Sequence, residues 1–308
     1  MAGSFRVRVF AFLFFLLLLL SAPRSITLNH LTTALRRLTL ESPALGGITH
    51  VDVLLPTGYS TSTQRFPVLY LLHGSGGSYS DWLRNTDIAR FARGLPLIVV
   101  MPDGDDGWYA DPLTVGPRWE TYHINELIPY IDRNYRTIAT RHGRAIAGLS
   151  MGGFGAFSYA ARHPDLFVAA ASISGALNPE AFLGLPGVQA AFGIHTTLSI
   201  RAHSPIDLVA NLRGIRLFLS SGNGNPGPLD SNHLSSPDSI EQTVHPSFVT
   251  MVAALHAAHI PAVVDNYGNG THTWPYWQRE LHRAMPMLLA ALAQPPTARP
   301  GLTFRYAL

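Results

Sequence analysis

The sequence predicts an α/β fold with a mostly parallel central sheet and helices on both faces. Short, continuous apolar runs alternate along the chain with longer stretches of helical periodicity. Continuous apolar runs are typical of parallel strands that are buried on both faces. Repeated alternation of strand and helix is the pattern of a sheet covered by helices. Of the 308 residues, 47% are hydrophobic and 13% are charged, so the chain can bury a large core.

The expected elements follow one another from the amino end. Leu31, Leu38 and Leu40 indicate a first edge strand within residues 26–47. Further strands are expected at residues 48–55, 66–72, 95–101, 144–149, 166–173, 215–220 and 262–267. Helices are expected at residues 81–93, 119–135, 152–163, 247–259 and 274–292. Segments 177–214 and 223–246, rich in Pro, Gly, Ser and Asn, are predicted to be loops over the carboxyl edge of the sheet, where open α/β sheets bind ligands.

The two ends of the chain are expected to lie outside the folded domain. Arg6 and Arg8 precede an apolar run at residues 9–20, which is too short to span a bilayer and suits a secretory signal peptide. Pro23 and Arg24 weaken the cleavage site, so an uncleaved N-terminal anchor is the alternative. We expect residues 1–25 to direct export, residues 26–294 to form one α/β domain and residues 295–308 to be a tail. The protein is then secreted or associated with the cell envelope.

Charge and cysteine content exclude several classes of protein. The 22 basic residues are all Arg and give a net charge of +3, but they are spread thinly and do not cluster with aromatic residues, so nucleic acid is not an expected partner. The chain has no cysteine, which excludes disulfides, thiolate metal sites and a cysteine nucleophile. No H-E-x-x-H or comparable spacing occurs, so neither a metal nor a cofactor is expected.

The strongest motif is Gly-Leu-Ser-Met-Gly at residues 148–152, centred on Ser150. G-x-S-x-G alone is a weak signal, but here it follows an apolar strand and opens a helix of small residues. This context predicts the nucleophile elbow of the α/β-hydrolase fold. The turn places Ser150 at a helix N-terminus, where the dipole and the free N–H groups favour developing negative charge. The alternative is a Gly-rich packing turn with an incidental Ser.

A serine nucleophile needs a base, which in this fold follows the last strand. Of the 14 His residues, His272 lies in a Gly-rich loop between the last predicted strand and the closing helix. His163, His256 and His259 fall in or at the ends of helices, and His282 lies inside the final helix. His272 is therefore the predicted base.

The sequence offers more than one candidate for the acid of the triad. Gly and Asn follow the 215–220 strand, where an acid is common. Asp230, Asp238, Glu241 and Asp265 all precede His272, and Asp265 falls inside a strand pattern. Chain order and loop placement leave Asp230 and Glu241 as alternatives.

The oxyanion hole is expected to use two backbone N–H groups. One belongs to Met151, directly after the nucleophile, and the other to Ser75 in the His-Gly-Ser-Gly-Gly segment at residues 73–77. Nearby side chains are candidates for substrate contacts: His73, Trp108, Tyr109 and Trp274.

Several motifs in one order resemble the esterase D-like family and, within it, the secreted mycolyltransferases. They are Tyr-Leu-Leu-His-Gly at 70–74, Val-Val-Met-Pro-Asp-Gly at 99–104, Trp-Glu-Thr at 119–121, Ala-Gly-Leu-Ser-Met-Gly-Gly at 147–153, Ser-Gly-Ala-Leu-Asn-Pro at 174–179, Ser-Gly-Asn-Gly at 221–224 and Thr-His-Thr-Trp-Pro-Tyr-Trp at 271–277. The resemblance implies Glu241 as the acid, ahead of Asp230, and supports Ser75 and Met151 as oxyanion donors. His73 stands where the mycolyltransferases carry a sugar-binding Asp, so trehalose recognition does not carry over.

The expected function is a secreted serine carboxylesterase that acts on lipid or carbohydrate esters through an acyl-enzyme intermediate, with Ser150, His272 and Glu241 as its triad. The alternative is a mycolyltransferase-like acyltransferase that passes the acyl group to a sugar or glycerol hydroxyl. A non-catalytic binding protein on the same fold is the third reading. The expected partner is a small-molecule, lipid or carbohydrate ester.

Overall fold

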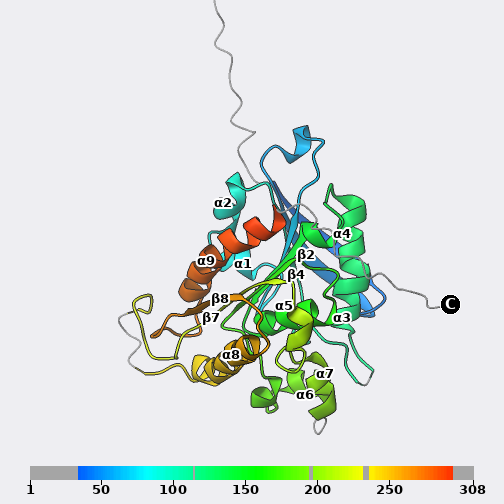
Figure 1. Cartoon of the computed structure of the whole chain (residues 1–308). Helices are drawn as coiled ribbons and strands as arrows, with labels where there is room; N and C mark the ends of the chain where they lie inside the picture. Colours follow the sequence, from blue (N-terminus) through cyan, green and yellow to red (C-terminus); the bar gives the residue numbers. More distant parts are fainter. Residues whose placement is uncertain (1–33, 114, 194–196, 232–235, 294–308) are drawn as a thin grey trace, which may run out of the picture.

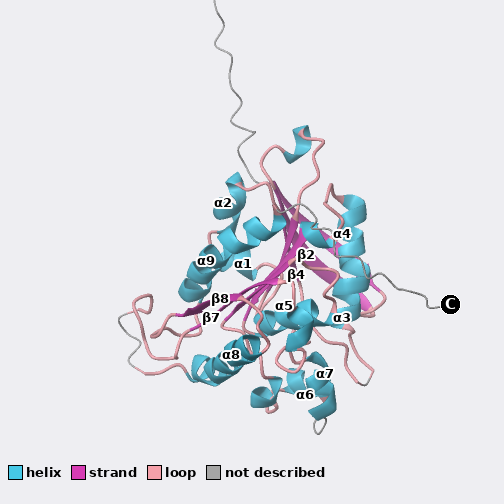
Figure 2. Ribbon diagram, in the orientation of Figure 1, coloured by secondary structure: helices cyan, strands magenta, loops and turns pink. Residues whose placement is uncertain are grey.

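One sheet forms the centre of the molecule in the computed structural model, which describes residues 34–113, 115–193, 197–231 and 236–293. Its strand order is β1-β2-β4-β3-β5-β6-β7-β8, and the sheet lies between layers of helices in Figures 1 and 2. The strands are β1 (Ala34–Ser42), β2 (Gly47–Leu55), β3 (Val68–Leu72), β4 (Ile98–Pro102), β5 (Arg144–Leu149), β6 (Ala169–Ile173), β7 (Arg216–Ser221) and β8 (Ala262–Asn266). β2 pairs antiparallel with both β1 and β4, whereas β3, β4, β5, β6, β7 and β8 run parallel to one another. The predicted α/β fold with a mostly parallel sheet is confirmed.

Helices cover both faces of the sheet because the central strands are apolar on both sides. In β3, Val68 and Tyr70 join one buried cluster while Leu69 and Leu71 join the other. The first cluster includes residues of α4 (Ile128–Asn134), α5 (Met151–Arg162) and α8 (Ser239–Ala257). The second includes residues of α1 (Asp81–Asn85), α2 (Ile88–Phe91) and α9 (Trp274–Leu292). Alternate residues of a strand face opposite sides, so one short strand contributes to both layers.

The structure differs from the sequence prediction at several helices. The helix expected at residues 81–93 is divided between α1 and α2, and the one at 119–135 contains a π-helical segment, Tyr122–Leu127, between α3 (Trp119–Thr121) and α4. The segment 177–214, predicted to be a loop, contains α6 (Pro186–Phe192) and α7 (Thr197–His203), which lie below α5 in the view of Figure 1.

Helix α8 begins eight residues earlier than predicted, inside the second expected loop. Asp238 caps it: its Oδ1 accepts the N–H groups of Ile240 (2.8 Å) and Glu241 (3.0 Å), which lack intrahelical acceptors. Pro246 therefore lies within the helix rather than before it. Glu241 therefore lies in the first turn of a helix and not in a loop.

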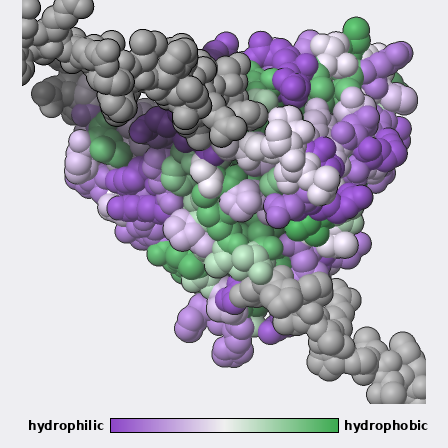
Figure 3. Space-filling model, turned by 90° about the horizontal axis from the view of Figure 1, so that it is seen from above, coloured by the Kyte–Doolittle hydropathy of each residue, from purple (hydrophilic) through white to green (hydrophobic). Residues whose placement is uncertain are grey.

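The outer surface is mixed in character. In Figure 3 hydrophilic residues dominate both sides of the visible face, with hydrophobic residues gathered between them. Within the described ranges, no helix is both long and apolar enough to cross a membrane. The predicted leader (residues 1–25), Leu31 and the tail (residues 295–308) lie outside those ranges.

Candidate active site

Ser150 lies at a sharp turn between β5 and α5. Its backbone has φ 54° and ψ −123°, a conformation that L-residues rarely adopt. The surrounding glycines cannot carry side chains: a Cβ on Gly148 would lie 2.3 Å from the carbonyl oxygen of Gly152, and one on Gly152 would lie 2.4 Å from that of His73. Strand, strained serine and helix thus have the geometry of a nucleophile elbow.

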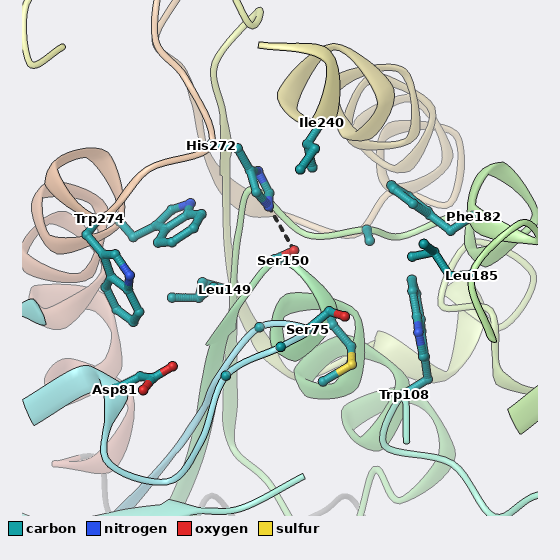
Figure 4. A pocket seen from close by; sticks show the side chains of 16 residues that line it. Ser75, Asp81, Trp108, Leu149, Ser150, Phe182, Leu185, Ile240, His272 and Trp274 are labelled. Atoms are coloured by element: carbon teal, nitrogen blue, oxygen red, sulfur yellow. Dashed lines mark hydrogen bonds between the residues drawn. The ribbon is translucent and has the colours of Figure 1, made fainter. Parts of the chain in front are cut away.

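His272 approaches Ser150 from the loop between β8 and α9. Its Nε2 is 2.8 Å from Ser150 Oγ, and its Nδ1 is 2.6 Å from Oε2 of Glu241 (Figure 4 shows the Ser150 contact). The backbone N–H of His272 also donates to Oδ2 of Asp238, at 3.1 Å. The structure therefore joins Ser150, His272 and Glu241 in one continuous set of hydrogen bonds, although they are far apart in the sequence.

Glu241 is fully buried, and both of its carboxylate oxygens have partners. Oε1 accepts from Ser174 Oγ (3.0 Å), Ser221 Oγ (2.9 Å) and the Gly222 N–H (2.7 Å). A buried carboxylate needs such donors to offset the loss of water. Oε2 is then directed to His272 and holds the imidazole with its Nδ1 as the donor.

Asp230, the alternative acid, lies elsewhere. Its carboxylate accepts from Thr271 Oγ1, from the Tyr276 hydroxyl (3.0 Å) and from the Gly227 N–H (2.7 Å). These hydrogen bonds connect the Asp230 loop to the start of α9, and Asp230 makes no hydrogen bond to His272. Asp238, which the sequence offered as a candidate acid but did not favour, caps α8 and accepts the backbone N–H of His272. The signal was present: Asp238 and Glu241 have the spacing of a helix N-terminal capping box.

The two predicted oxyanion donors lie beside the serine. Met151 is the first residue of α5, where helix geometry provides no intrahelical acceptor for its N–H. Ser75 lies in a turn closed by the Gly77 N–H donating to the Gly74 carbonyl, at 3.1 Å. Gly74 packs directly against the elbow, because a Cβ there would lie 3.3 Å from the Cβ of Ser150. The turn thus brings residue 75 next to the candidate nucleophile.

A cavity of about 510 Å³ opens at Ser150 and extends to both sides of it (Figure 4). On one side lie four apolar side chains: Trp108, Phe182, Leu185 and Ile240. On the other side lie Leu149, Trp274 and the carboxylate of Asp81. The cavity is in the size range of small-molecule sites, and its lining is mainly apolar.

Two predicted substrate contacts are corrected by the structure. Trp108 and Trp274 line the cavity, but His73 and Tyr109 are buried and are not among its lining residues. His73 donates from Nδ1 to the Gly74 carbonyl (2.7 Å) and accepts the Gly104 N–H at Nε2 (2.9 Å). The Tyr109 hydroxyl donates to the His73 carbonyl, at 2.9 Å. Both side chains therefore link the loop that follows β3 to the loop that follows β4.

The mostly parallel sheet and the strand–serine–helix elbow define the class of α/β-hydrolase folds. Comparison with known proteins agrees. Residues 42–288 match the model of the family described as Putative esterase, and the chain belongs to that family.

Two curated relatives and one solved structure illustrate the likeness. Esterase Rv1288 of Mycobacterium tuberculosis is 40% identical over 210 residues, which are 61% of this chain and 45% of that protein, so the chain spans less than half of that relative's length. The diacylglycerol acyltransferase/mycolyltransferase Ag85A of Mycobacterium leprae is 30% identical over 287 residues, 85% of this chain and 84% of the relative. A ferulic acid esterase structure superposes with a TM-score of 0.68 at 25% identity, covering 84% of this chain and 99% of that one.

Proposed function

We propose that this protein is a serine carboxylesterase that cleaves acyl esters through an acyl-enzyme intermediate. One observation carries the proposal: Ser150 Oγ, His272 Nε2, His272 Nδ1 and Glu241 Oε2 form an unbroken hydrogen-bonded series with contacts of 2.8 and 2.6 Å. A hydroxyl bonded to an imidazole, which is in turn oriented by a buried carboxylate, is the arrangement that activates serine for attack on a carbonyl.

In the proposed mechanism, Ser150 attacks the ester carbonyl as His272 takes its proton. Glu241 keeps the imidazole in the required tautomer and stabilises its positive charge. The N–H groups of Ser75 and Met151 stabilise the oxyanion of the tetrahedral intermediate. His272 then gives its proton to the leaving alcohol, which departs and leaves an acyl group on Ser150. Water activated by His272 releases the acid.

The two sides of the cavity suggest how the substrate lies. The side formed by Trp108, Phe182, Leu185 and Ile240 suits an acyl chain, since it offers apolar and aromatic surface. The side with Trp274 and Asp81 suits the alcohol part of the ester, because a carboxylate accepts hydrogen bonds from hydroxyl groups. Lipid or carbohydrate esters with an acyl group of modest length fit this division.

Acyl transfer is the second candidate function. A cavity that continues past Ser150 has room for an acceptor hydroxyl to replace water in the second half-reaction, and the relative Ag85A carries an acyltransferase name. Sugar or glycerol hydroxyls are the proposed acceptors. Residues 1–25 are proposed to direct the enzyme out of the cell or into the cell envelope, where such esters would be met.

The test combines active-site labelling with turnover. A fluorophosphonate probe is expected to label the wild-type protein and not the Ser150→Ala variant, and no labelling of either would leave a non-catalytic binding protein. A series of p-nitrophenyl esters, run with and without glycerol or trehalose, then separates the two activities. Faster ester consumption together with an acylated acceptor indicates a transferase, and release of free acid at an unchanged rate indicates an esterase.

A further inference from the structure

The turn that carries Ser75 has little in its own sequence to hold one conformation. Residues 74–77 read Gly-Ser-Gly-Gly, and Gly76 has φ 69°, in the region that glycine enters readily. An oxyanion donor contributes only if it already points at the position where charge develops. One hydrogen bond, from the Gly77 N–H to the Gly74 carbonyl, closes the turn from within, so contacts from outside the turn are also needed to fix the Ser75 N–H.

Asp106 makes such contacts. Its Oδ1 accepts the hydroxyl of Ser75 at 2.5 Å and the backbone N–H of Gly76 at 2.7 Å. One oxygen atom thus holds the side chain of Ser75 and the peptide group that follows it. Fixing both limits the rotation of the backbone at residue 75. Hydrogen bonds to an ionised acceptor are also stronger than those between neutral groups.

The segment that presents Asp106 is itself unusual. Asp105, Trp108 and Tyr109 have φ values of 43°, 50° and 53°, so three of its non-glycine residues are in the left-handed region. Each such residue costs on the order of 1 kcal/mol and persists only where the surroundings impose it. Strain of this kind is found where a loop has to place particular atoms.

The surroundings do impose this conformation. The Gly104 N–H donates to Nε2 of His73, and the Tyr109 hydroxyl donates to the His73 carbonyl, both at 2.9 Å. On the opposite side, a Cβ on Gly187 of α6 would lie 2.3 Å from the carbonyl oxygen of Asp106, so the two backbones are in close contact. The loop that carries Asp106 is thus hydrogen-bonded to His73, just before the Ser75 turn, and packs against α6 on its other side.

We propose that Asp106 is a positioning residue, which clamps the Ser75 turn so that the Ser75 N–H is aimed at the oxyanion. This rests on the function proposed above. Asp106 does not line the cavity, and it acts through Ser75 rather than on the substrate. The buried side chains of His73 and Tyr109 hold the Asp106 loop against the Ser75 loop. Both had been expected to contact the substrate, and their role in this proposal is to support the position of Asp106.

The test uses the full-length protein with Asp106→Ala, which removes the acceptor, and Asp106→Asn, which keeps an acceptor oxygen without the charge. Asp105→Asn is the matched control, because it removes the neighbouring charge and Asn tolerates a positive φ. The measurements are kcat and KM on the best p-nitrophenyl ester, the inhibition constant of phenylboronic acid and the thermal midpoint. The boronic acid reports on the hole, because its tetrahedral adduct with serine mimics the transition state.

For Asp106→Ala we expect kcat to fall by about 10- to 100-fold with KM changed less than about 3-fold, since misplacing one donor costs less than removing it. The phenylboronic acid constant should rise in parallel, and the thermal midpoint should stay within a few degrees of wild type. Asp106→Asn should retain about a third or more of kcat, and Asp105→Asn all of it.

The proposal is overturned if Asp106→Ala keeps its kcat or its boronic acid affinity, or if Asp105→Asn loses as much activity. It is also overturned if the loss in Asp106→Ala comes with a large fall in thermal midpoint, which would make the role purely structural. Wild type and Ser150→Ala are measured alongside. If the wild-type protein neither hydrolyses esters nor takes up a fluorophosphonate, the proposed esterase function is wrong. If it does both, the Asp106 variants test the positioning role alone.

Discussion

The indole of Trp277 packs edge-on against the imidazole of His272, with ring centroids 4.9 Å apart and planes at 86°. Trp277 is 8% exposed, borders the cavity and joins the core beneath α9. Trp277 therefore anchors the final helix and also supports the ring of the proposed base.

This contact predicts that Trp277→Leu lowers kcat by about 10-fold, because the imidazole loses its lateral support and samples other orientations. Trp277→Phe is the control. The indole N–H has no acceptor among the described residues, so phenylalanine keeps the edge contact and forfeits no hydrogen bond. Steady-state kinetics on a short ester should show the Phe variant within about 3-fold of wild type. Equal losses in both variants would contradict this role.

Replacing the buried acid should have a much larger effect. In Glu241→Gln the amide cannot satisfy both sides: if its oxygen faces Ser174, Ser221 and Gly222, its NH₂ group faces His272 and favours the wrong tautomer. By analogy with the equivalent change in serine proteases, we expect kcat to fall by about 10³- to 10⁴-fold.

Asp230→Asn is the matched control for the acid, since Asp230 contacts Tyr276 and not His272. Its kcat should stay within about 3-fold of wild type, as for other changes away from the reacting atoms. Kinetics in which Asp230→Asn is the more damaged variant would reverse the assignment of the acid.

The elbow should not tolerate even one methyl group. A Cβ on Gly152 would lie 2.4 Å from the His73 carbonyl oxygen and 2.7 Å from that of Leu72, and backbone atoms of a central strand cannot yield cheaply. Gly152→Ala should lose stability by about 1–3 kcal/mol and lose most activity. Gly47→Ala, where nothing lies within 4 Å, should be close to neutral. Urea unfolding and ester turnover measure both; a stable, active Gly152→Ala protein would refute the packing argument.

Acyl selectivity should respond to Ile240. This side chain is 51% exposed and lies on the cavity side assigned to the acyl chain. Ile240→Trp should reduce kcat/KM more for long p-nitrophenyl esters than for acetate, by about 10-fold or more, because the indole occupies space that a long chain needs. Val249→Trp places the same bulk on the exposed part of α8 outside the cavity and should leave the chain-length profile unchanged. A uniform loss for all esters would argue against this side as the acyl site.

Stability should depend on pH through Glu280 in α9. Its side chain is fully buried, Oε1 accepts from Arg279 at 2.7 Å, and Oε2 has no partner among the described residues. Burial raises the pKa of Glu280 from 4.5 to about 7. The folded state therefore holds this proton more tightly than the unfolded chain does, so its contribution to stability is present below about pH 4.5 and is lost as the pH rises through about 7.

Glu280→Gln keeps the neutral form at every pH. Relative to wild type, the variant should gain stability between pH 5 and pH 8 by the order of 2 kcal/mol. Urea unfolding at the two pH values measures this difference, and the comparison cancels the other titrating groups. If the two proteins lose stability equally over this range, Glu280 is ionised in both the folded and unfolded states and the prediction is wrong.

The local features of this protein could be predicted from its sequence. The parallel strands are continuous apolar runs, and the elbow is a strand, a Gly-Leu-Ser-Met-Gly turn and a helix in immediate succession. Such features depend on neighbours within a few residues, so pattern and sterics suffice. The position of His272 followed from chain order in the fold, and the structure places its ring next to Ser150.

Only the tertiary structure separated Glu241 from Asp230 by geometry. That choice depends on where α8 begins and on three donors from two other segments, which no local pattern records. Burial likewise decided the roles of His73 and Tyr109, since a polar aromatic side chain near a site in sequence can face the substrate or the core. The contact of Asp106 with the Ser75 turn joins two loops that follow neighbouring parallel strands, and it exists only because the sheet brings their carboxyl ends together.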